Sequence, residues 1–529
     1  MSFSPPLPPS SPILSLPELS TYLSELHQSH ALIIKTGLIR HPLATVRLLS
    51  SATASSSLSY ADSLFDRIPS PSTFSYNILI RAHARSADPQ PALRLFLRML
   101  PSPARPDNFT FPFLLKACTS LLALPEALQL HALVLKSGSR FTSDVFVQNS
   151  LIHFYAAANL TEDAYKLFDR MPNRDAVTWN SIISVYVSNR LIGPARALFD
   201  EMPERSLETW NFMISGYVNA GLLDGARDLF DRMPMRDVVS WNAMITGCVR
   251  GGLTADAIEL FQGMLGENVR PDECTLVNVL SSCARSGALG QGEWVRAYID
   301  RNGVEIRGFL ATALVDMYSK CGCIDKALRV FEDARKKDVS TWNAIIDGLS
   351  SHGYEEHALR LFHMMAVEGF VPNAVTFVSV LSACSHAGLL DKGRYIFKCM
   401  VKDYKIEPTV EHYGCMVDLF GRAGLLEEAE EIIERVGARD APMLWESLLS
   451  ACRNRGDVGF AELVAKRLLE LTPASDSCYV QLSNVYASAG RWDDVREVRN
   501  MMRIRGVRKE PGCSTIEIDG VVHEFFVGD

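Results

Sequence analysis

A short string, alanine followed by two variable residues, an aliphatic residue and phenylalanine, recurs along most of the 529-residue chain. Its phenylalanines are Phe65, Phe96, Phe168, Phe199, Phe230, Phe261, Phe331 and Phe362. Successive members are 31, 72, 31, 31, 31, 70 and 31 residues apart, and each large gap fits two units of about 35 residues. This spacing predicts a continuous array of repeats with units of more than one length.

An asparagine keeps the same phase, 19 residues before the marker phenylalanine of its unit. It occurs as Asn77, Asn149, Asn180, Asn211, Asn242 and Asn343, and Thr312 takes its place once. Two markers in one phase exclude coincidence. Because asparagine costs roughly 0.5 kcal/mol or more against alanine within a helix, its recurrence requires a reason other than helix formation.

Residues 238–272 show what one unit is expected to form. Apolar residues recur at helical spacing from Trp241 until Gly251, and a second helix carries Phe261 and ends before Pro271. One such hairpin cannot cover its own apolar stripe, so it must stack on neighbouring hairpins. We therefore predict an all-α fold, a right-handed α-solenoid superhelix of about 12 hairpin repeats followed by a helical extension.

The two markers set the expected boundaries of the units. The repeat array, residues 73–440, divides into 73–107, 108–144, 145–175, 176–206, 207–237, 238–272, 273–307, 308–338, 339–373, 374–409 and 410–440. Residues 20–72 are expected to be degenerate N-terminal repeats, and residues 441–511 to be a helical extension that lacks both markers. In the terminal segment, residues 512–529, polar and apolar residues alternate around Asp519-Gly520, which predicts a short β-hairpin.

Composition excludes several classes of function. The chain has 53 basic and 61 acidic residues, a net charge of −8, which argues against coating nucleic acid by bulk charge. It has no run of 18 apolar residues, so no membrane helix is predicted. The sequence also lacks Cys-x-x-Cys pairs and the His-x-Glu string of zinc deaminases. We expect no catalytic centre, no metal and no cofactor.

Three strings resemble plant pentatricopeptide repeat proteins of the class that mixes long and short units, the PLS class. They are residues 238–245 (VVSWNAMI), 313–322 (ALVDMYSKCG) and 230–234 (FDRMP). Residues 410–511 are similar to the last repeat and the E extension of that class. Residues 512–529 resemble its E+ segment, although Thr515 stands where the family usually has tryptophan. The chain stops where many relatives continue into a DYW deaminase domain, so we expect that domain to be lacking.

The resemblance implies sequence-specific binding of single-stranded organellar RNA, with neither DNA nor a membrane as partner. It implies a specificity factor for C-to-U RNA editing that acts with a DYW-type deaminase and other editing factors in trans. An organellar splicing or stability factor is one alternative. A peptide-binding scaffold of the tetratricopeptide kind is another, although its Trp-x-x-Leu-Gly-x-x-Tyr signature is missing.

The N-terminal segment, residues 1–19, is expected to be either an organellar transit peptide or a disordered tail. Its first 17 residues are rich in serine and proline and carry no charged side chain. They also lack the arginines of a typical mitochondrial presequence, so the chloroplast is slightly favoured over the mitochondrion.

In the family, the fifth and the last residue of a unit together read one base. The matching pairs that prefer uridine are Asn77 with Asp107, Asn149 with Asp175, Asn211 with Asp237, and Asn242 with Asp272. The resemblance assigns cytidine to Asn180 with Ser206, guanosine to Thr312 with Asp338, and a pyrimidine to Asn343 with Asn373. Pro112, Val277 and Val378 hold the fifth position in the remaining long units, where an apolar side chain predicts little discrimination.

The chemistry of these residues supports such a role. An amide offers a donor and an acceptor to a Watson–Crick edge, and a nearby carboxylate can fix its orientation. The residues three before the reader could hold bases between units by apolar and stacking contacts. They are Phe74, Phe146, Val177, Val239 and Phe309, whereas Glu208 and Ser340 break the pattern. Helix capping is the alternative explanation for the unit-ending aspartates.

Overall fold

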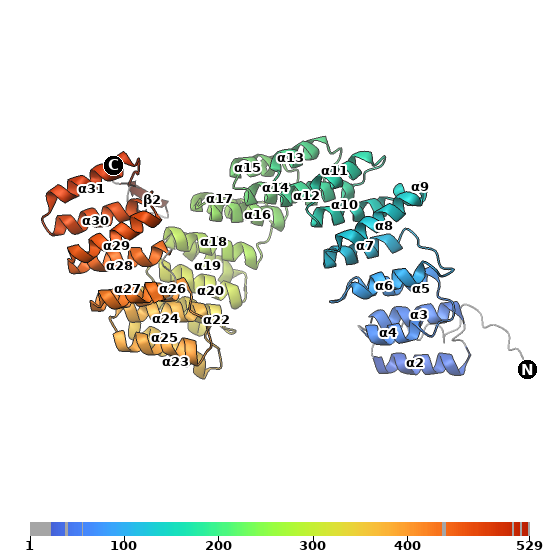
Figure 1. The fold of residues 1–529 in the computed structure, drawn as a ribbon, viewed down its shortest axis with the longest axis horizontal. Helices are drawn as coiled ribbons and strands as arrows, with labels where there is room; N and C mark the ends of the chain where they lie inside the picture. The colour runs from blue at the N-terminus through green and yellow to red at the C-terminus, as the bar shows by residue number, and fades with distance from the viewer. Residues whose placement is uncertain are drawn as a thin grey trace, which may run out of the picture. The chain divides into compact units, whose positions relative to one another are not determined.

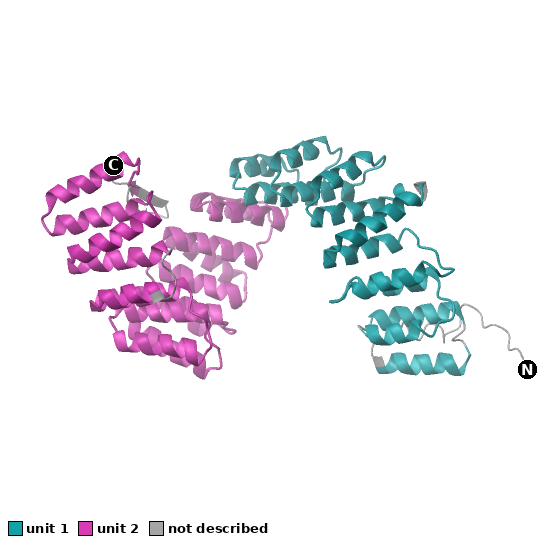
Figure 2. Cartoon of the chain, viewed as in Figure 1, with its two compact units in different colours: residues 1–236 teal, residues 237–529 magenta. Residues whose placement is uncertain are grey.

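A computed structural model describes residues 23–37, 41–54, 57–435, 441–509, 513–518 and 521–526 of the chain. This part consists of α-helices joined by short turns, with one pair of strands near its end (Figure 1). The chain divides into two compact units, residues 1–236 and 237–529 (Figure 2). The N-terminal segment 1–19 and residues 436–440 lie outside the described residues.

The first unit is a stack of helical hairpins. From residue 73 onward, the first helix of a hairpin packs on its own second helix and on the first helix of the next hairpin. The helices are α2 (Leu23–Lys35), α3 (Pro42–Ala54), α4 (Leu58–Phe65), α5 (Thr73–His83), α6 (Gln90–Met99), α7 (Thr110–Leu121), α8 (Leu124–Lys136), α9 (Ser139–Thr142), α10 (Val145–Ala157), α11 (Thr161–Arg170), α12 (Ala176–Ser188), α13 (Ile192–Glu201), α14 (Leu207–Asn219) and α15 (Leu223–Arg232).

The second unit repeats this arrangement and ends in two strands. Its helices are α16 (Val238–Arg250), α17 (Thr254–Gly266), α18 (Glu273–Ser286), α19 (Leu289–Arg301), α20 (Gly308–Lys320), α21 (Ile324–Asp333), α22 (Val339–Ser351), α23 (Glu355–Val367), α24 (Ala374–His386), α25 (Leu390–Lys402), α26 (Val410–Ala423), α27 (Leu426–Arg435), α28 (Pro442–Arg455), α29 (Val458–Leu471), α30 (Asp476–Ser488) and α31 (Trp492–Ile504). Strands β1 (Cys513–Ile518) and β2 (Val521–Phe526) pair antiparallel, with Ile518 opposite Val521. The predicted terminal β-hairpin is therefore confirmed.

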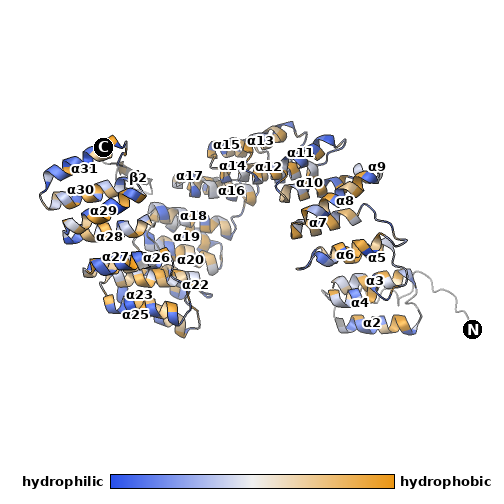
Figure 3. Ribbon diagram, in the orientation of Figure 1, coloured by the Kyte–Doolittle hydropathy of each residue, from blue (hydrophilic) through white to orange (hydrophobic). Residues whose placement is uncertain are grey.

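Caps and turns explain where the helices begin and end. Asp272 caps α18 by accepting from the backbone N–H of Thr275 at 2.8 Å, which satisfies a donor that has no partner within the helix. Gly287, at φ 70°, ends the same helix in the left-handed conformation that glycine adopts at little cost. Hydrophobic and hydrophilic residues mix along the helices (Figure 3), as expected of hairpins that each bury one face.

Aromatic side chains form the core between successive hairpins. All the marker phenylalanines are buried, and so are Trp179, Trp210, Trp241 and Trp342 on the first helices. A phenylalanine of one second helix meets the tryptophan of the next first helix edge to face, with ring centroids 4.9 Å apart for Phe168 and Trp179, 4.8 Å for Phe199 and Trp210, and 4.7 Å for Phe331 and Trp342. The predicted all-α solenoid, in which neighbouring hairpins share one core, is confirmed.

Within the described residues, every helix is too short or too polar to cross a bilayer.

Replacing Trp342 by alanine should destabilise the second unit strongly, because this side chain is fully buried against Phe331. We expect a loss of about 3–5 kcal/mol in the free energy of unfolding, followed by urea denaturation with circular dichroism. Trp492→Ala is the matched control, because Trp492 is 62% exposed at the start of α31. Equal losses for the two variants would contradict the assignment of Trp342 to the inter-hairpin core.

Candidate nucleic-acid interface

The structure brings most of the predicted reader pairs into contact. In each pair, the amide Nδ2 of the fifth residue donates a hydrogen bond to Oδ1 of the last residue of the same unit. The donor–acceptor distances are 2.9 Å for Asn77 to Asp107, 3.4 Å for Asn149 to Asp175, 3.0 Å for Asn242 to Asp272, and 3.2 Å for Asn343 to Asn373. The donor, on the first helix, thus bonds to the residue that precedes the next unit.

The unit-ending residues also cap helices, as the alternative explanation expected. Asp175, Ser206, Asp272, Asp338 and Asn373 each accept from the backbone N–H three residues further on. Capping and amide orientation are not exclusive, because a carboxylate has lone pairs for both. Asp272 accepts from Asn242 and from the N–H of Thr275 through the same oxygen, Oδ1.

A buried hydroxyl, which the sequence interpretation missed, completes four of the reader sites. The third residue of the next repeat donates to Oδ1 of the reader asparagine. The Oγ1–Oδ1 distances are 2.8 Å for Thr110 to Asn77, 2.6 Å for Thr209 to Asn180, 2.6 Å for Thr275 to Asn242, and 2.6 Å for Thr376 to Asn343. Each of these four amides is therefore held at both ends. The oxygen faces the hydroxyl, and the nitrogen faces the unit-ending residue, or Glu208 in the case of Asn180. Oδ1 of Asn149 has no such donor among the described residues.

A signal for this hydroxyl is present in the sequence. Where the reader is asparagine or threonine, the third residue of the next unit is threonine or serine, as at Thr110, Thr178, Thr209, Ser240, Thr275, Thr341 and Thr376. Where the reader is Pro112 or Val277, the third residue is Val147 or Leu310, and both of these are buried. The polarity of this position therefore follows that of the preceding reader, with His412 after Val378 as the exception.

The hydrogen bonds also act on the carboxylates. Burial opposes ionisation of Asp272, but the bonds from the Thr275 backbone and the Asn242 amide outweigh it and lower the pKa of Asp272. Asp175 is affected in the same way, and bonds from Thr178 and Asn149 lower its pKa despite burial. A carboxylate that stays ionised can only accept, so it fixes the adjacent amide with its nitrogen inward.

The reader amides are recessed in the surface. Asn77, Asn180 and Asn343 are only 6–8% exposed, and Asn149, Asn211 and Asn242 are partly exposed. After its two bonds, an amide such as that of Asn77 still has one N–H and one oxygen lone pair. A ligand must therefore bring a flat polar edge directly against the helix to reach these groups.

Two predicted pairs are arranged differently. Asn180 donates to Oε2 of Glu208 at 3.3 Å, and it is linked to Ser206 through Thr209, whose Oγ1 lies 2.9 Å from the serine Oγ. Thr312 is likewise linked to Asp338 through Oγ1 of Thr341, at 3.0 Å from Thr312 and 2.8 Å from the carboxylate. In the remaining pair, Asn211 belongs to the first compact unit, residues 1–236, and Asp237 belongs to the second, residues 237–529.

The predicted base-sandwiching residues are exposed apolar side chains, each near the start of a different first helix. Phe74, Phe146, Val177, Val239 and Phe309 are between 56% and 71% exposed. The prediction omitted Phe109 and Val375, which are equally exposed and lie three residues before Pro112 and Val378. Residues three apart share one face of a helix, so each exposed side chain stands beside its reader position.

Basic residues lie at the other end of the same helical face in the second unit. Each is exposed, stands in the last turn of a first helix, and follows the second residue of its unit by 11 residues, about three helical turns. They are Arg250, Arg285, Lys320, His386 and Arg422. Cations there also favour the helix dipole. Lys320 is paired with Asp316 at 3.0 Å and Arg422 with Asp418 at 2.9 Å, so only part of this charge faces a ligand.

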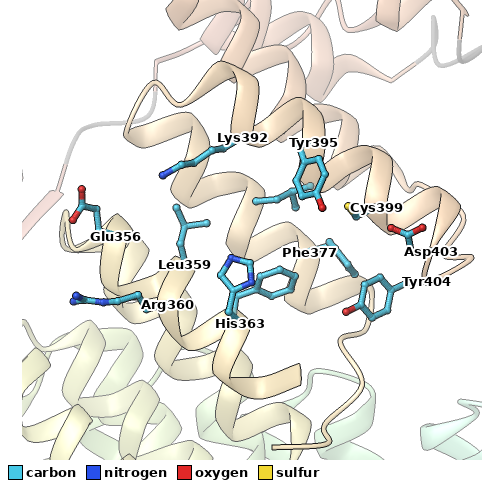
Figure 4. A pocket seen from close by; sticks show the side chains of 12 residues that line it. Glu356, Leu359, Arg360, His363, Phe377, Lys392, Tyr395, Cys399, Asp403 and Tyr404 are labelled. Carbon is cyan, nitrogen blue, oxygen red and sulfur yellow. The ribbon is translucent and has the colours of Figure 1, made fainter. Parts of the chain in front are cut away.

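A separate cavity of about 660 Å³ lies between second helices α23 and α25 (Figure 4). Its origin is visible in a comparison with the hairpins that contain α17 and α19. There Tyr298, 37 residues after Phe261, packs edge-on against that ring at 5.9 Å. The equivalent residue 37 places after Phe362 is Cys399, whose small side chain leaves the space open beside Tyr395. The cavity therefore results from a small side chain in the packing between second helices, and these helices carry no reader residue.

Among the residues that the structure describes, no group of three or more His, Cys, Asp or Glu side chains is placed to hold a metal ion.

Replacing Thr275 by valine should remove the hydroxyl from a fully buried position and leave Oδ1 of Asn242 without that donor. We expect the free energy of unfolding at pH 7 to fall by about 1–3 kcal/mol, measured by urea denaturation. The hydrogen bonds to the Asp272 carboxylate lower its pKa in the folded protein. The stability that they contribute is therefore present at pH values above the pKa of the unfolded chain, near 3.8, and is lost as the pH falls through the lower pKa of the folded protein. An unchanged midpoint at pH 7 would contradict the role of the hydroxyl.

Comparisons with known proteins agree with this arrangement. The E motif model matches residues 456–517, the PPR repeat family model matches 71–120, 236–285 and 337–386, and the PPR repeat model matches 149–175, 177–207, 208–238, 309–339, 375–404 and 411–439. The chain is 58% identical over 502 residues to pentatricopeptide repeat-containing protein At4g18840 of Arabidopsis thaliana, covering 94% of this chain and 92% of the relative. It is 46% identical over 508 residues to At5g66520 of the same plant, covering 96% and 77%.

A solved structure supports the fold. The pentatricopeptide repeat protein PPR10 in complex with an 18-nt psaJ RNA element superposes with a TM-score of 0.55 at 16% identity, over 94% of this chain and 87% of that one. The chain belongs to the pentatricopeptide repeat family, and its E motif fits the PLS class of that family.

Proposed function

We propose that this chain is a sequence-specific single-stranded RNA-binding protein of a plant organelle, and a specificity factor for C-to-U RNA editing with a deaminase supplied in trans. The observation that carries the proposal is the exposed apolar side chain that stands beside a hydrogen-bonded reader position in five of the repeats. Flat apolar surface suits the faces of bases, and oriented polar groups suit their edges. Single-stranded RNA offers both, spaced along one strand.

Different comparisons support RNA binding and an organellar location. PPR10, whose fold this chain shares, was crystallised with an RNA element. Two further relatives from Arabidopsis thaliana, At1g08070 and At2g42920, are named chloroplastic and are 40% and 45% identical to this chain. The E motif fits the PLS class, which supports an editing role.

The proposed affinity does not need a strongly basic protein. Base-edge and stacking contacts act at short range and add up along the array. The row of basic residues from Arg250 to Arg422 supplies phosphate contacts along the same helical face. A net charge of −8 then limits nonspecific binding to other polyanions, because long-range attraction is weak.

Read from N to C along the RNA in the 5′ to 3′ sense, the units from 73 to 373 specify U, any base, U, C, U, U, any base, G and a pyrimidine. Replacing the G opposite Thr312 and Asp338 by A should weaken binding of a matching oligonucleotide about 5- to 100-fold, measured by gel shift. Changing the base opposite Val277 is the control and should have little effect. Equal affinity for G and A would overturn the proposed reading at this unit.

Replacing Phe146 or Phe309 by alanine should each weaken RNA binding by about 1–3 kcal/mol, the value of one base-stacking contact. The two rings are 71% and 68% exposed, so thermal stability should change little. Val367→Ala is the control, because Val367 is 87% exposed on second helix α23, away from the reader row. Fluorescence anisotropy with the labelled tract measures the effect, and unchanged affinity in both phenylalanine variants would argue against base sandwiching.

A further inference from the structure

One reader site has a glutamate from the second position of the next unit beside its amide, which the other asparagine and threonine readers lack. At Asn77, Asn242 and Asn343 the amide nitrogen donates to the last residue of the same unit, within 3.2 Å. At Asn180 that last residue is Ser206, and the amide donates instead to Oε2 of Glu208, at 3.3 Å. Glu208 therefore provides the oxygen partner that Asp107, Asp272 and Asn373 provide elsewhere.

Glu208 also occupies the second position of its repeat, where seven other repeats expose a phenylalanine or a valine. It lies in the first turn of α14 and is exposed. An acid in the first turn is favourable for the helix dipole, which accounts for a glutamate at this place. The dipole does not account for the contact with Asn180 on the preceding first helix. Because of that contact, the carboxylate lies beside the amide that is proposed to read the base.

Asn180 and Glu208 leave both a hydrogen-bond donor and hydrogen-bond acceptors for a ligand. Oδ1 of Asn180 accepts from Thr209 at 2.6 Å, and one of its two N–H groups is donated to Glu208. The second N–H remains as a donor, and the exposed carboxylate has further lone pairs as acceptors. The site therefore presents a donor next to an anionic acceptor, whereas Phe146 or Val239 presents only apolar surface at the same position. The carboxylate of Glu208 also differs from that of Asp272, whose Oδ1 already accepts from the helix-capping N–H of Thr275, because the cap of α14 is Ser206.

We infer that Glu208 is a specificity-determining residue, which makes the unit of Asn180 select a base with an exocyclic amino group. Such a group, on cytosine or adenine, donates to the carboxylate, as in known contacts between Glu and cytosine N4. Uracil and guanine have a carbonyl oxygen at the same place. Its lone pairs would point at those of the carboxylate, and the two oxygens would repel each other. This inference rests on the proposed RNA-binding function and assigns one further residue to it.

The test uses the full chain and four oligonucleotides of the proposed tract that differ only in the fourth base, C, A, U or G. Wild type should bind the C and A forms about tenfold or more tightly than the U and G forms. Glu208→Val, which introduces the residue found at Val177 and Val239, should reduce this difference to less than about twofold. Glu208→Gln should shift the preference toward U and G, because its amide can donate to a carbonyl oxygen.

Glu411→Val is the matched control. Glu411 is also an exposed acid at the second position of a unit, but the reader before it is Val378, which has no amide. This variant should leave the preference at the fourth base unchanged. Thermal unfolding of each variant checks that the fold is retained.

The outcomes separate this inference from the proposed function. If Glu208→Val keeps the full preference for C and A over U and G, or if wild type discriminates only at other positions, the inference is overturned while RNA binding stands. If wild type binds none of the oligonucleotides, the proposed function fails, and the inference fails with it.

Discussion

The structure depends on a hydrogen-bonded bridge between successive hairpins. A buried threonine hydroxyl of one hairpin bonds to an amide oxygen of the previous one, and the carboxylate before that threonine bonds to the amide nitrogen. Leaving such buried groups without partners would cost free energy, so the bridge fixes one hairpin against the next. The same bridge fixes the orientation of the amide that is proposed to read RNA. The same hydrogen bonds therefore set how successive hairpins stack and how the reader amide is oriented.

Much of this fold follows from the sequence because its strongest signals are local and periodic. The spacing of the marker phenylalanines and the interrupting glycines predicts hairpins, and Phe331 packed on Trp342 confirms that neighbouring hairpins share a core. The pairing of reader with unit-ending residue came from the family resemblance rather than from spacing alone. Residues 30 apart, such as Asn77 and Asp107, meet only because the hairpin between them folds back.

The parts that sequence reasoning missed are contacts between units. The role of Thr275 depends on an atom of Asn242, 33 residues earlier, and threonine also suits a helix start for reasons of capping. A local pattern therefore could not separate the two roles. The contact of Glu208 with Asn180 is similar, because the sequence shows only that an acid breaks an apolar series. The low exposure of the amides was also not predictable, because it depends on how closely the next hairpin packs.

The bridge limits which residues can stand at the reader position. An amide or hydroxyl there satisfies the buried hydroxyl of the next unit, as Asn343 does for Thr376 and as Thr312 does for Thr341. An apolar residue cannot, and after Val277 the next unit has Leu310 in place of threonine. A change of reader from asparagine to valine alone would leave a buried hydroxyl without that partner. Reader and hydroxyl are thus expected to change together, so the array is constrained as pairs of adjacent units rather than as independent repeats.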